Sequence, residues 1–136
     1  MKIKVPTVEN VIQTNKFVCN EKGQISHLLD RGKIESAIST AFYPGSEPFE
    51  NGGVARLAGS LCFYLTKIHA FLDGNKRTAT LAAIIFMNAN GWDLSYPDND
   101  EDEFSELAKI INQAAASEIS RGELIEWFEL HKILID

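Results

Sequence analysis

Cysteine is scarce in this chain, with only two among its 136 residues. Cys19 and Cys62 have neither the spacing of a metal site nor the number that a disulfide framework requires. Cys62 lies inside the apolar run AGSLCFYL, which predicts that it packs in the core. We therefore expect both residues to be reduced thiols.

Long apolar runs are missing as well, because none reaches the roughly 18 residues of a membrane-spanning helix. The amino end also lacks the pattern of a secretory leader, in which charged residues precede an apolar segment and a cleavage site. These absences predict no membrane partner and a location in the cytoplasm.

Positive charge is in the minority, with 13 lysines and arginines against 19 aspartates and glutamates and a formal net charge of −6. Non-specific binding of nucleic acid depends on a basic surface, so the composition argues against a direct nucleic-acid partner. A phosphate-binding role would have to be local.

Internal repeats and low-complexity linkers are also absent, so we expect one domain over residues 1–136, long enough to bury a core. Apolar residues recur at helical spacing along most of the chain, and the only strands expected are those of a short hairpin near residue 45. The predicted fold class is therefore all-α, a compact bundle of about six helices. The segments with helical spacing are 8–21, 28–43, 54–68, 78–90, 101–116 and 119–135.

Two predictions concern single polar residues in this pattern. Ser120 and Glu123 have the spacing of a capping box, which predicts a helix start at this point. His27 and His131 have no partner at a meaningful spacing, so we expect both side chains to be exposed.

The stretch HAFLDGNKRTAT, residues 69–80, places two cations where a long apolar helix begins. The amino end of a helix carries partial positive charge, so Lys76 and Arg77 are each unfavourable there by ~0.3–1 kcal/mol. An anion lying between them would explain the arrangement.

The neighbouring residues supply the chemistry that such an anion requires. A turn at Gly74 that leads into a helix leaves backbone N–H groups free to bind phosphate, and Arg77 adds a forked donor. Asp73 can hold a Mg²⁺ ion that bridges phosphates, and His69 can take a proton from an attacking hydroxyl. Together these residues describe transfer of a phosphate-containing group from a nucleotide.

Each of these residues has an ordinary structural interpretation when it is taken alone. His69 would serve as a helix C-cap, Asp73 and Asn75 as turn formers, and Lys76 and Arg77 as solvated surface charges. The weight of the functional interpretation comes from nine positions that occur together.

This nine-residue run, HAFLDGNKR, resembles the motif of the Fic/Doc family, His-x-Phe-x-Asp/Glu-Gly/Ala-Asn-Gly/Lys-Arg, and matches it at every defined position. The stretches LLDRGKIESAI and NKRTATLAAIIFMNANGWDL also resemble the early and central helices of Doc-type proteins, and the short chain is similar to theirs. The resemblance implies an all-α Fic fold with the active-site loop between two central helices.

Carried over residue by residue, the resemblance assigns a role to each matching position. It implies that His69 is the general base towards a target hydroxyl and that Asp73 is the Mg²⁺ ligand. Asn75 and the backbone around Gly74 would form the anion site, and the catalytic Arg77 would bind the terminal phosphates of ATP.

Lys76 is the position that separates the two chemistries of the family. AMP-transferring Fic enzymes usually have glycine there, whereas Doc-type sequences have lysine, which implies ATP bound so that it presents its γ-phosphate. The resemblance thus implies a Doc-like toxin that phosphorylates a threonine or serine of elongation factor Tu and arrests translation. The alternatives are an AMP transferase and a non-catalytic nucleotide-binding module, and the intact His69 argues against the second because a sensor needs no base.

The proline- and glycine-rich segment 43–53 is predicted to be a loop or hairpin. In Fic proteins a flap just upstream of the motif helix docks the target as an added strand, so Gly45, Ser46 and Glu47 are candidate docking residues. SEPFEN in this segment matches an inhibitory pattern of the family, but Pro48 would interrupt the helix which that pattern requires. We therefore expect control by a separate, Phd-like antitoxin that binds as a helix in a groove.

Overall fold

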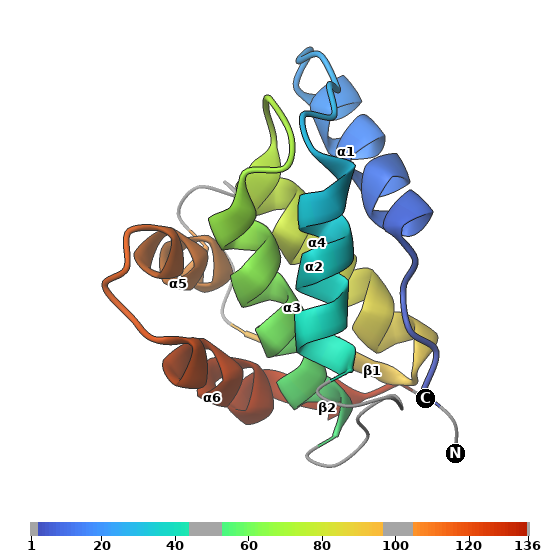
Figure 1. Ribbon diagram of the computed structural model, residues 1–136. Helices are drawn as coiled ribbons and strands as arrows, with labels where there is room; N and C mark the ends of the chain where they lie inside the picture. The colour runs from blue at the N-terminus through green and yellow to red at the C-terminus, as the bar shows by residue number, and fades with distance from the viewer. Residues whose placement is uncertain (1–2, 44–52, 97–104, 136) are drawn as a thin grey trace.

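The computed structural model describes residues 3–43, 53–96 and 105–135 of the 136-residue chain. These residues form six helices and one two-stranded sheet (Figure 1). The elements are α1 Val8–Glu21, α2 Arg31–Phe42, α3 Val54–Ile68, α4 Asn75–Ala89, β1 Trp92–Leu94, α5 Glu106–Ala115, α6 Arg121–His131 and β2 Lys132–Leu134. The predicted all-α fold class is confirmed.

Side chains determine where most of these helices begin. Four helices have an N-cap residue whose side chain accepts a hydrogen bond from a backbone N–H in the first turn, which satisfies a donor that has no partner inside the helix. The predicted capping box of α6 is confirmed, with Ser120 and Glu123 bonded to each other's backbone N–H groups. The four N-cap residues are Thr7, Asp30, Ser105 and Ser120.

Helix α3 lies at the centre of the bundle and packs against α2, α4, α5 and α6 (Figure 1). Its buried residues therefore occur on several faces, among them Leu57, Leu61 and Leu65. One hydrophobic cluster draws on every helix of the bundle. With 15 residues at most, no helix in the described ranges is long and apolar enough to cross a membrane.

Both cysteines are free, as predicted, and the predicted burial of Cys62 is confirmed. Cys19 is buried as well, which was not predicted. Burial raises the pKa of the Cys62 thiol to about 12 and outweighs the nearby Thr66 and Thr80 hydroxyls, which lower it. Cys62 is therefore neutral at physiological pH and packs as a small apolar residue in the core.

The small sheet was not predicted, because residues 119–135 were expected to form one helix to the end. Instead α6 ends at His131 and β2 follows at once, since Lys132 has an extended backbone with ψ of 143°. β2 pairs antiparallel with β1, Trp92 opposite Leu134. Strands of three residues are too short to show an alternating pattern, so only the tertiary pairing reveals them.

His27 and His131 were both predicted to have exposed side chains. The prediction is correct for His27 and wrong for His131, which is partly buried. The His131 ring stacks on Trp127, with ring centroids 4.0 Å apart. Its Nε2 lies 3.2 Å from the carboxylate of Glu106 on α5. This cluster joins α5 to α6, and the sequence could not predict it because Glu106 and His131 are distant along the chain.

The predicted β-hairpin and its docking residues Gly45, Ser46 and Glu47 lie within residues 44–52, outside the described part of the chain. The hairpin and its role in docking a target therefore stay predictions. Gly53 and His69 lie at opposite ends of α3, whose 15 residues at 1.5 Å each make a helix roughly 22 Å long.

Gly59 on α3 packs closely against Ile125 on α6. A Cβ atom added there would lie only 2.9 Å from the Cα of Ile125, so backbone would have to move. We expect Gly59→Ala to lower the free energy of unfolding by about 1–3 kcal/mol, as overpacking does in a tight core. Urea unfolding followed by circular dichroism measures this value.

The matched control is Gly122→Ala in the exposed first turn of α6, where the nearest atom would be Ser120 Oγ at 3.8 Å. This change should be neutral or stabilise the protein by up to about 1 kcal/mol, because alanine is the better helix former. Equal effects of the two substitutions would contradict the close α3–α6 approach.

Candidate active site

The motif loop, residues 69–74, joins the carboxyl end of α3 to the amino end of α4. Both of its ends have a left-handed backbone, His69 with φ of 47° and Gly74 with φ of 77°. Glycine adopts this conformation freely, but for another residue it costs roughly 1–2 kcal/mol. Strain of this kind is concentrated at functional sites.

His69 is the C-cap residue of α3, which is the structural role considered for it from the sequence. Its side chain is nevertheless exposed, and no group in the described ranges hydrogen-bonds to its imidazole. The backbone thus has a structural role, while the ring remains open to exchange a proton with a bound molecule.

A second segment holds the motif loop in place. Residues 27–30 run antiparallel to residues 70–72, and Leu28 forms a bridge with Phe71. Three backbone hydrogen bonds of 2.8 to 3.2 Å join the two segments. The two segments lie together at one end of the bundle, opposite the sheet (Figure 1). Phe71 is buried and anchors the loop, which agrees with its assignment to the core.

The side chain of Asn75 closes the motif loop on itself. Its Oδ1 accepts from the Phe71 N–H at 3.1 Å, and its Nδ2 donates to the Phe71 carbonyl at 2.8 Å. The carboxamide is thus used inside the loop, as a turn former would be. The backbone N–H of Asn75 and the second N–H of its Nδ2 have no acceptor among the described residues, so both are left for the predicted anion site.

The amino end of α4 has three free backbone donors. Its first helical hydrogen bond runs from the Thr78 N–H to the Gly74 carbonyl, at 2.8 Å, and no side chain caps the helix. The N–H groups of Asn75, Lys76 and Arg77 therefore have no acceptor among the described residues. Free donors at the positive end of a helix favour an anion, and this is the position of the predicted phosphate site, which stays a prediction.

Arg77 is oriented by two neutral acceptors. Its Nη1 donates to the Val18 carbonyl at 2.6 Å, and its Nη2 donates to Oε1 of Gln24. No carboxylate in the described ranges forms an ion pair with it. The guanidinium keeps its full charge and still has donors left among its five N–H groups, so it can also bind an anion.

Asp73 and Lys76 complete the predicted set and lie on either side of Gly74 and Asn75. The Asp73 carboxylate is partly exposed and has no partner in the described structure, and the Lys76 side chain is exposed. No group of three or more His, Cys, Asp or Glu residues in the described ranges could hold a metal by itself. Mg²⁺ usually binds one or two carboxylates together with phosphate oxygens, so the single carboxylate of Asp73 fits that ion.

Asn15, which was not predicted to belong to the site, supports the motif loop from α1. Asn15 on α1 is fully buried, and its Nδ2 donates to the Asp73 carbonyl at 2.9 Å and to Thr78 Oγ1 at 3.1 Å. The Ser26 hydroxyl donates to Asn15 Oδ1 at 2.7 Å. The available signal was an amide close to the apolar stripe of helix 8–21, since a buried amide must have partners. No pattern in the sequence indicated that Val18 and Gln24 contact Arg77.

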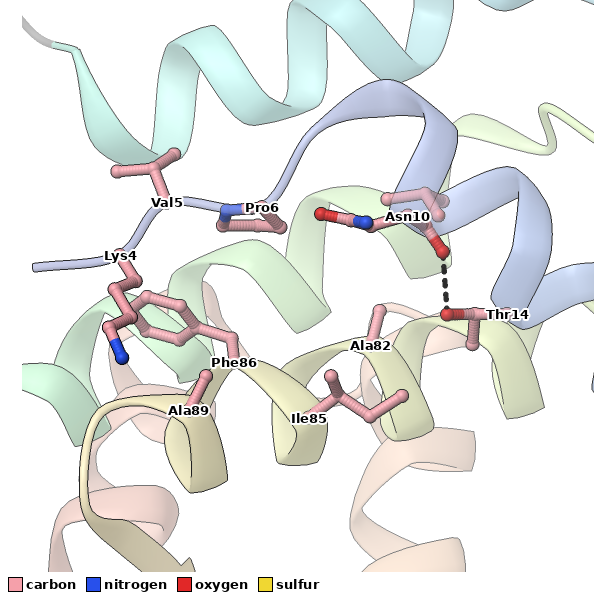
Figure 2. A pocket seen from close by; sticks show the side chains of 10 residues that line it. Lys4, Val5, Pro6, Asn10, Thr14, Ala82, Ile85, Phe86 and Ala89 are labelled. Atoms are coloured by element: carbon pink, nitrogen blue, oxygen red, sulfur yellow. Dashed lines mark hydrogen bonds between the residues drawn. The ribbon is translucent and has the colours of Figure 1, made fainter.

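A shallow pocket of about 120 Å³ lies elsewhere, between the amino-terminal segment, α1 and α4 (Figure 2). Its wall is mainly apolar, and no residue of the motif contributes to it. It therefore does not fit a phosphate group. The lining residues are Lys4, Val5, Pro6, Asn10, Val11, Thr14, Ala82, Ile85, Phe86 and Ala89.

The helical bundle thus places a helix start without a side-chain cap on the same loop as an exposed histidine. The sequence pattern of the Fic/DOC family matches residues 7–87, which is more than half of the 136 residues and includes the whole motif. The chain therefore belongs to the Fic/DOC family, whose members are typically transferases that act on proteins. The comparison with curated proteins finds no match.

Asn15→Ala tests the support beneath the motif loop. The substitution leaves the Asp73 carbonyl with only the Cys19 thiol as donor, at 3.6 Å, and removes the bonds that the buried Thr78 hydroxyl and the Ser26 hydroxyl make to Asn15. We expect the free energy of unfolding to fall by about 2–3 kcal/mol, the range for unsatisfied buried polar groups. Urea unfolding at neutral pH measures it.

Asn112→Ala is the control, because Asn112 is an exposed asparagine within α5 and its side chain has no hydrogen bond in the described structure. Its effect should stay within about 0.5 kcal/mol. A loss no greater for Asn15→Ala than for Asn112→Ala would contradict the proposed support.

Proposed function

We propose that this protein transfers the γ-phosphate of ATP to a threonine or serine hydroxyl of a target protein, in the manner of a Doc-type toxin. The observation that carries the proposal is the amino end of α4, where three free N–H groups and the uncompensated charge of Arg77 come together. The exposed His69 ends the preceding helix and supplies a base on the same loop.

The reaction follows from these roles. His69 takes the proton of the target hydroxyl, whose oxygen forms a bond to the γ-phosphorus as the bond to the β–γ bridging oxygen breaks. ADP leaves with that bridging oxygen and its electron pair. Arg77 and the free N–H groups of α4 stabilise the negative charge that spreads over the transferred group.

A Mg²⁺ ion fits the proposal through Asp73. The partly exposed carboxylate without a partner would hold the ion together with phosphate oxygens of ATP. When bound, the ion would neutralise charge on the phosphates. The protein's part is to hold the loop backbone that carries the Asp73 side chain, and the bond from Asn15 to the Asp73 carbonyl does so.

Lys76 favours phosphate transfer over AMP transfer. Its exposed side chain occupies space beside the free N–H groups that a glycine would leave open to the nucleotide. Its ammonium also adds a point charge at the rim of the anion site, which favours the dense negative charge at the end of a phosphate chain.

We extend the proposal to partners that the family resemblance implies. The target would be elongation factor Tu, and a Phd-like antitoxin would control the toxin in the cytoplasm by binding as a helix in a groove. Apolar surface for a docked polypeptide is available at the motif loop, because Leu72 is 57% exposed and Leu29, on the segment paired with that loop, is 55% exposed.

His69→Ala should abolish transfer while the protein stays folded, because the exposed ring has no structural bond in the described part of the chain. We expect a loss of at least about 100-fold in rate, the lower end of general-base catalysis, and relief of growth arrest when the variant is expressed. Transfer is measured by intact mass of elongation factor Tu after incubation with ATP and Mg²⁺.

His27→Ala is the control. His27 is an exposed histidine on the segment that borders the motif loop, and only its backbone carbonyl bonds to that loop. This variant should keep full activity. Undiminished activity of a folded His69→Ala protein would overturn the catalytic role of His69.

Lys76→Gly tests which group is transferred. With ATP labelled separately at the α and γ positions, the natural protein should label its target from γ only. Lys76→Gly should label it from α or lose activity, because glycine opens the space beside the helix start. Lys76→Arg, which keeps a charged side chain, should still transfer from γ. Labelling from α alone by the natural protein would replace the proposal with AMP transfer.

A further inference from the structure

Arg77 lies where the end of α1 meets the start of α4. Val18, whose carbonyl accepts from Nη1 at 2.6 Å, belongs to the last turn of α1. Carbonyl groups in a last helical turn have no partner within the helix and carry partial negative charge. The guanidinium of Arg77 donates to one of these carbonyl groups, that of Val18, which has no net charge.

Gln24 supplies the second acceptor, and the chain fixes its position. Gly23 follows α1 with a left-handed φ of 67°, which favours glycine. The Gln24 N–H then donates to the Cys19 carbonyl at 2.8 Å. This turn at the end of α1 sets the backbone from which the Gln24 side chain reaches Arg77, 53 positions further along the chain.

The chemical identity of this acceptor matters for the site. A carboxylate in the place of the amide would form an ion pair with the guanidinium and cancel the charge that attracts phosphate. An amide oxygen accepts the same hydrogen bond but carries no net charge. Gln24 can therefore orient Arg77 without neutralising it.

We propose that Gln24 is a positioning residue for nucleotide binding, which together with the Val18 carbonyl fixes the guanidinium of Arg77 where the end of α1 meets the start of α4 and leaves its charge intact. This inference rests on the proposed function, because it assumes that Arg77 binds nucleotide phosphates. It assigns to the turn after α1 a part in nucleotide affinity that lies outside the nine-residue motif.

Two substitutions of similar size separate orientation from charge. Gln24→Met removes the acceptor, and Gln24→Glu keeps it but adds a negative charge. Calorimetric titration with Mg·ATP and with pyrophosphate should show affinity falling about 3- to 10-fold for Gln24→Met and more than 10-fold for Gln24→Glu. In the transfer assay the KM for ATP should rise in the same order.

Gln13→Glu is the matched control, since it makes the same change of charge at an exposed position on α1 whose side chain has no hydrogen bond in the described structure. It should leave the Kd for Mg·ATP unchanged within about 2-fold. Unchanged affinity for Mg·ATP in a folded Gln24→Glu protein would overturn the inference. Tighter binding by Gln24→Met would also overturn it, and would mean that the bond to Gln24 holds Arg77 away from the nucleotide.

A double-mutant cycle tests the contact without any nucleotide. Gln24→Met and Arg77→Met should each lower the urea midpoint of unfolding, and the double variant should fall short of the sum of the two shifts. Strictly additive shifts would overturn the positioning role even if ATP binds. Non-additive shifts in a protein that binds neither ATP nor pyrophosphate would support the orientation of Arg77 by Gln24 and overturn the proposed function instead.

Discussion

The buried hydrogen bonds of Asn15 are the interaction on which the candidate active site depends. One carboxamide joins α1 to the Asp73 carbonyl in the motif loop and to the Thr78 hydroxyl in the first turn of α4. A fully buried polar side chain such as that of Asn15 needs hydrogen-bond partners, because a buried polar group without them costs free energy. The position of the loop relative to the helix start is therefore determined by α1, although every predicted site residue lies between residues 69 and 77, apart from those of the proposed flap.

The electrostatic arrangement gives an acidic protein a local positive site, the one to which we assign phosphate in the proposed function. The chain has a formal net charge of −6, but at the motif the amino end of α4 presents free N–H groups. The carboxyl end of α1 lies beside it and orients Arg77 through the Val18 carbonyl. A carbonyl and an amide hold the cation without cancelling it, so the positive potential stays local and directed.

Much of the fold could be predicted because helical spacing depends on local sequence. The prediction for α1 has the observed bounds of 8 and 21, and the capping box at Ser120 follows from two residues three positions apart. The three-residue strands and the contact of His131 with Glu106 could not be predicted, because both depend on segments far apart in the chain. A motif of nine adjacent residues likewise indicated the site, while Asn15, Val18 and Gln24 contact it from α1 and the turn that follows.

The sequence by itself determined which chemical groups the site contains and that they stand on a turn between two helices. The histidine, the carboxylate, the glycine and the arginine are adjacent in the chain, so local geometry is enough to bring them together. Only the tertiary structure decided how each group is used. The Asn75 carboxamide bonds to the Phe71 backbone inside the loop, whereas the ring of His69 has no hydrogen bond in the described structure and Arg77 bonds to α1. The physical reason is that orientation depends on hydrogen-bond partners from distant segments, which meet only when α1 packs against α4.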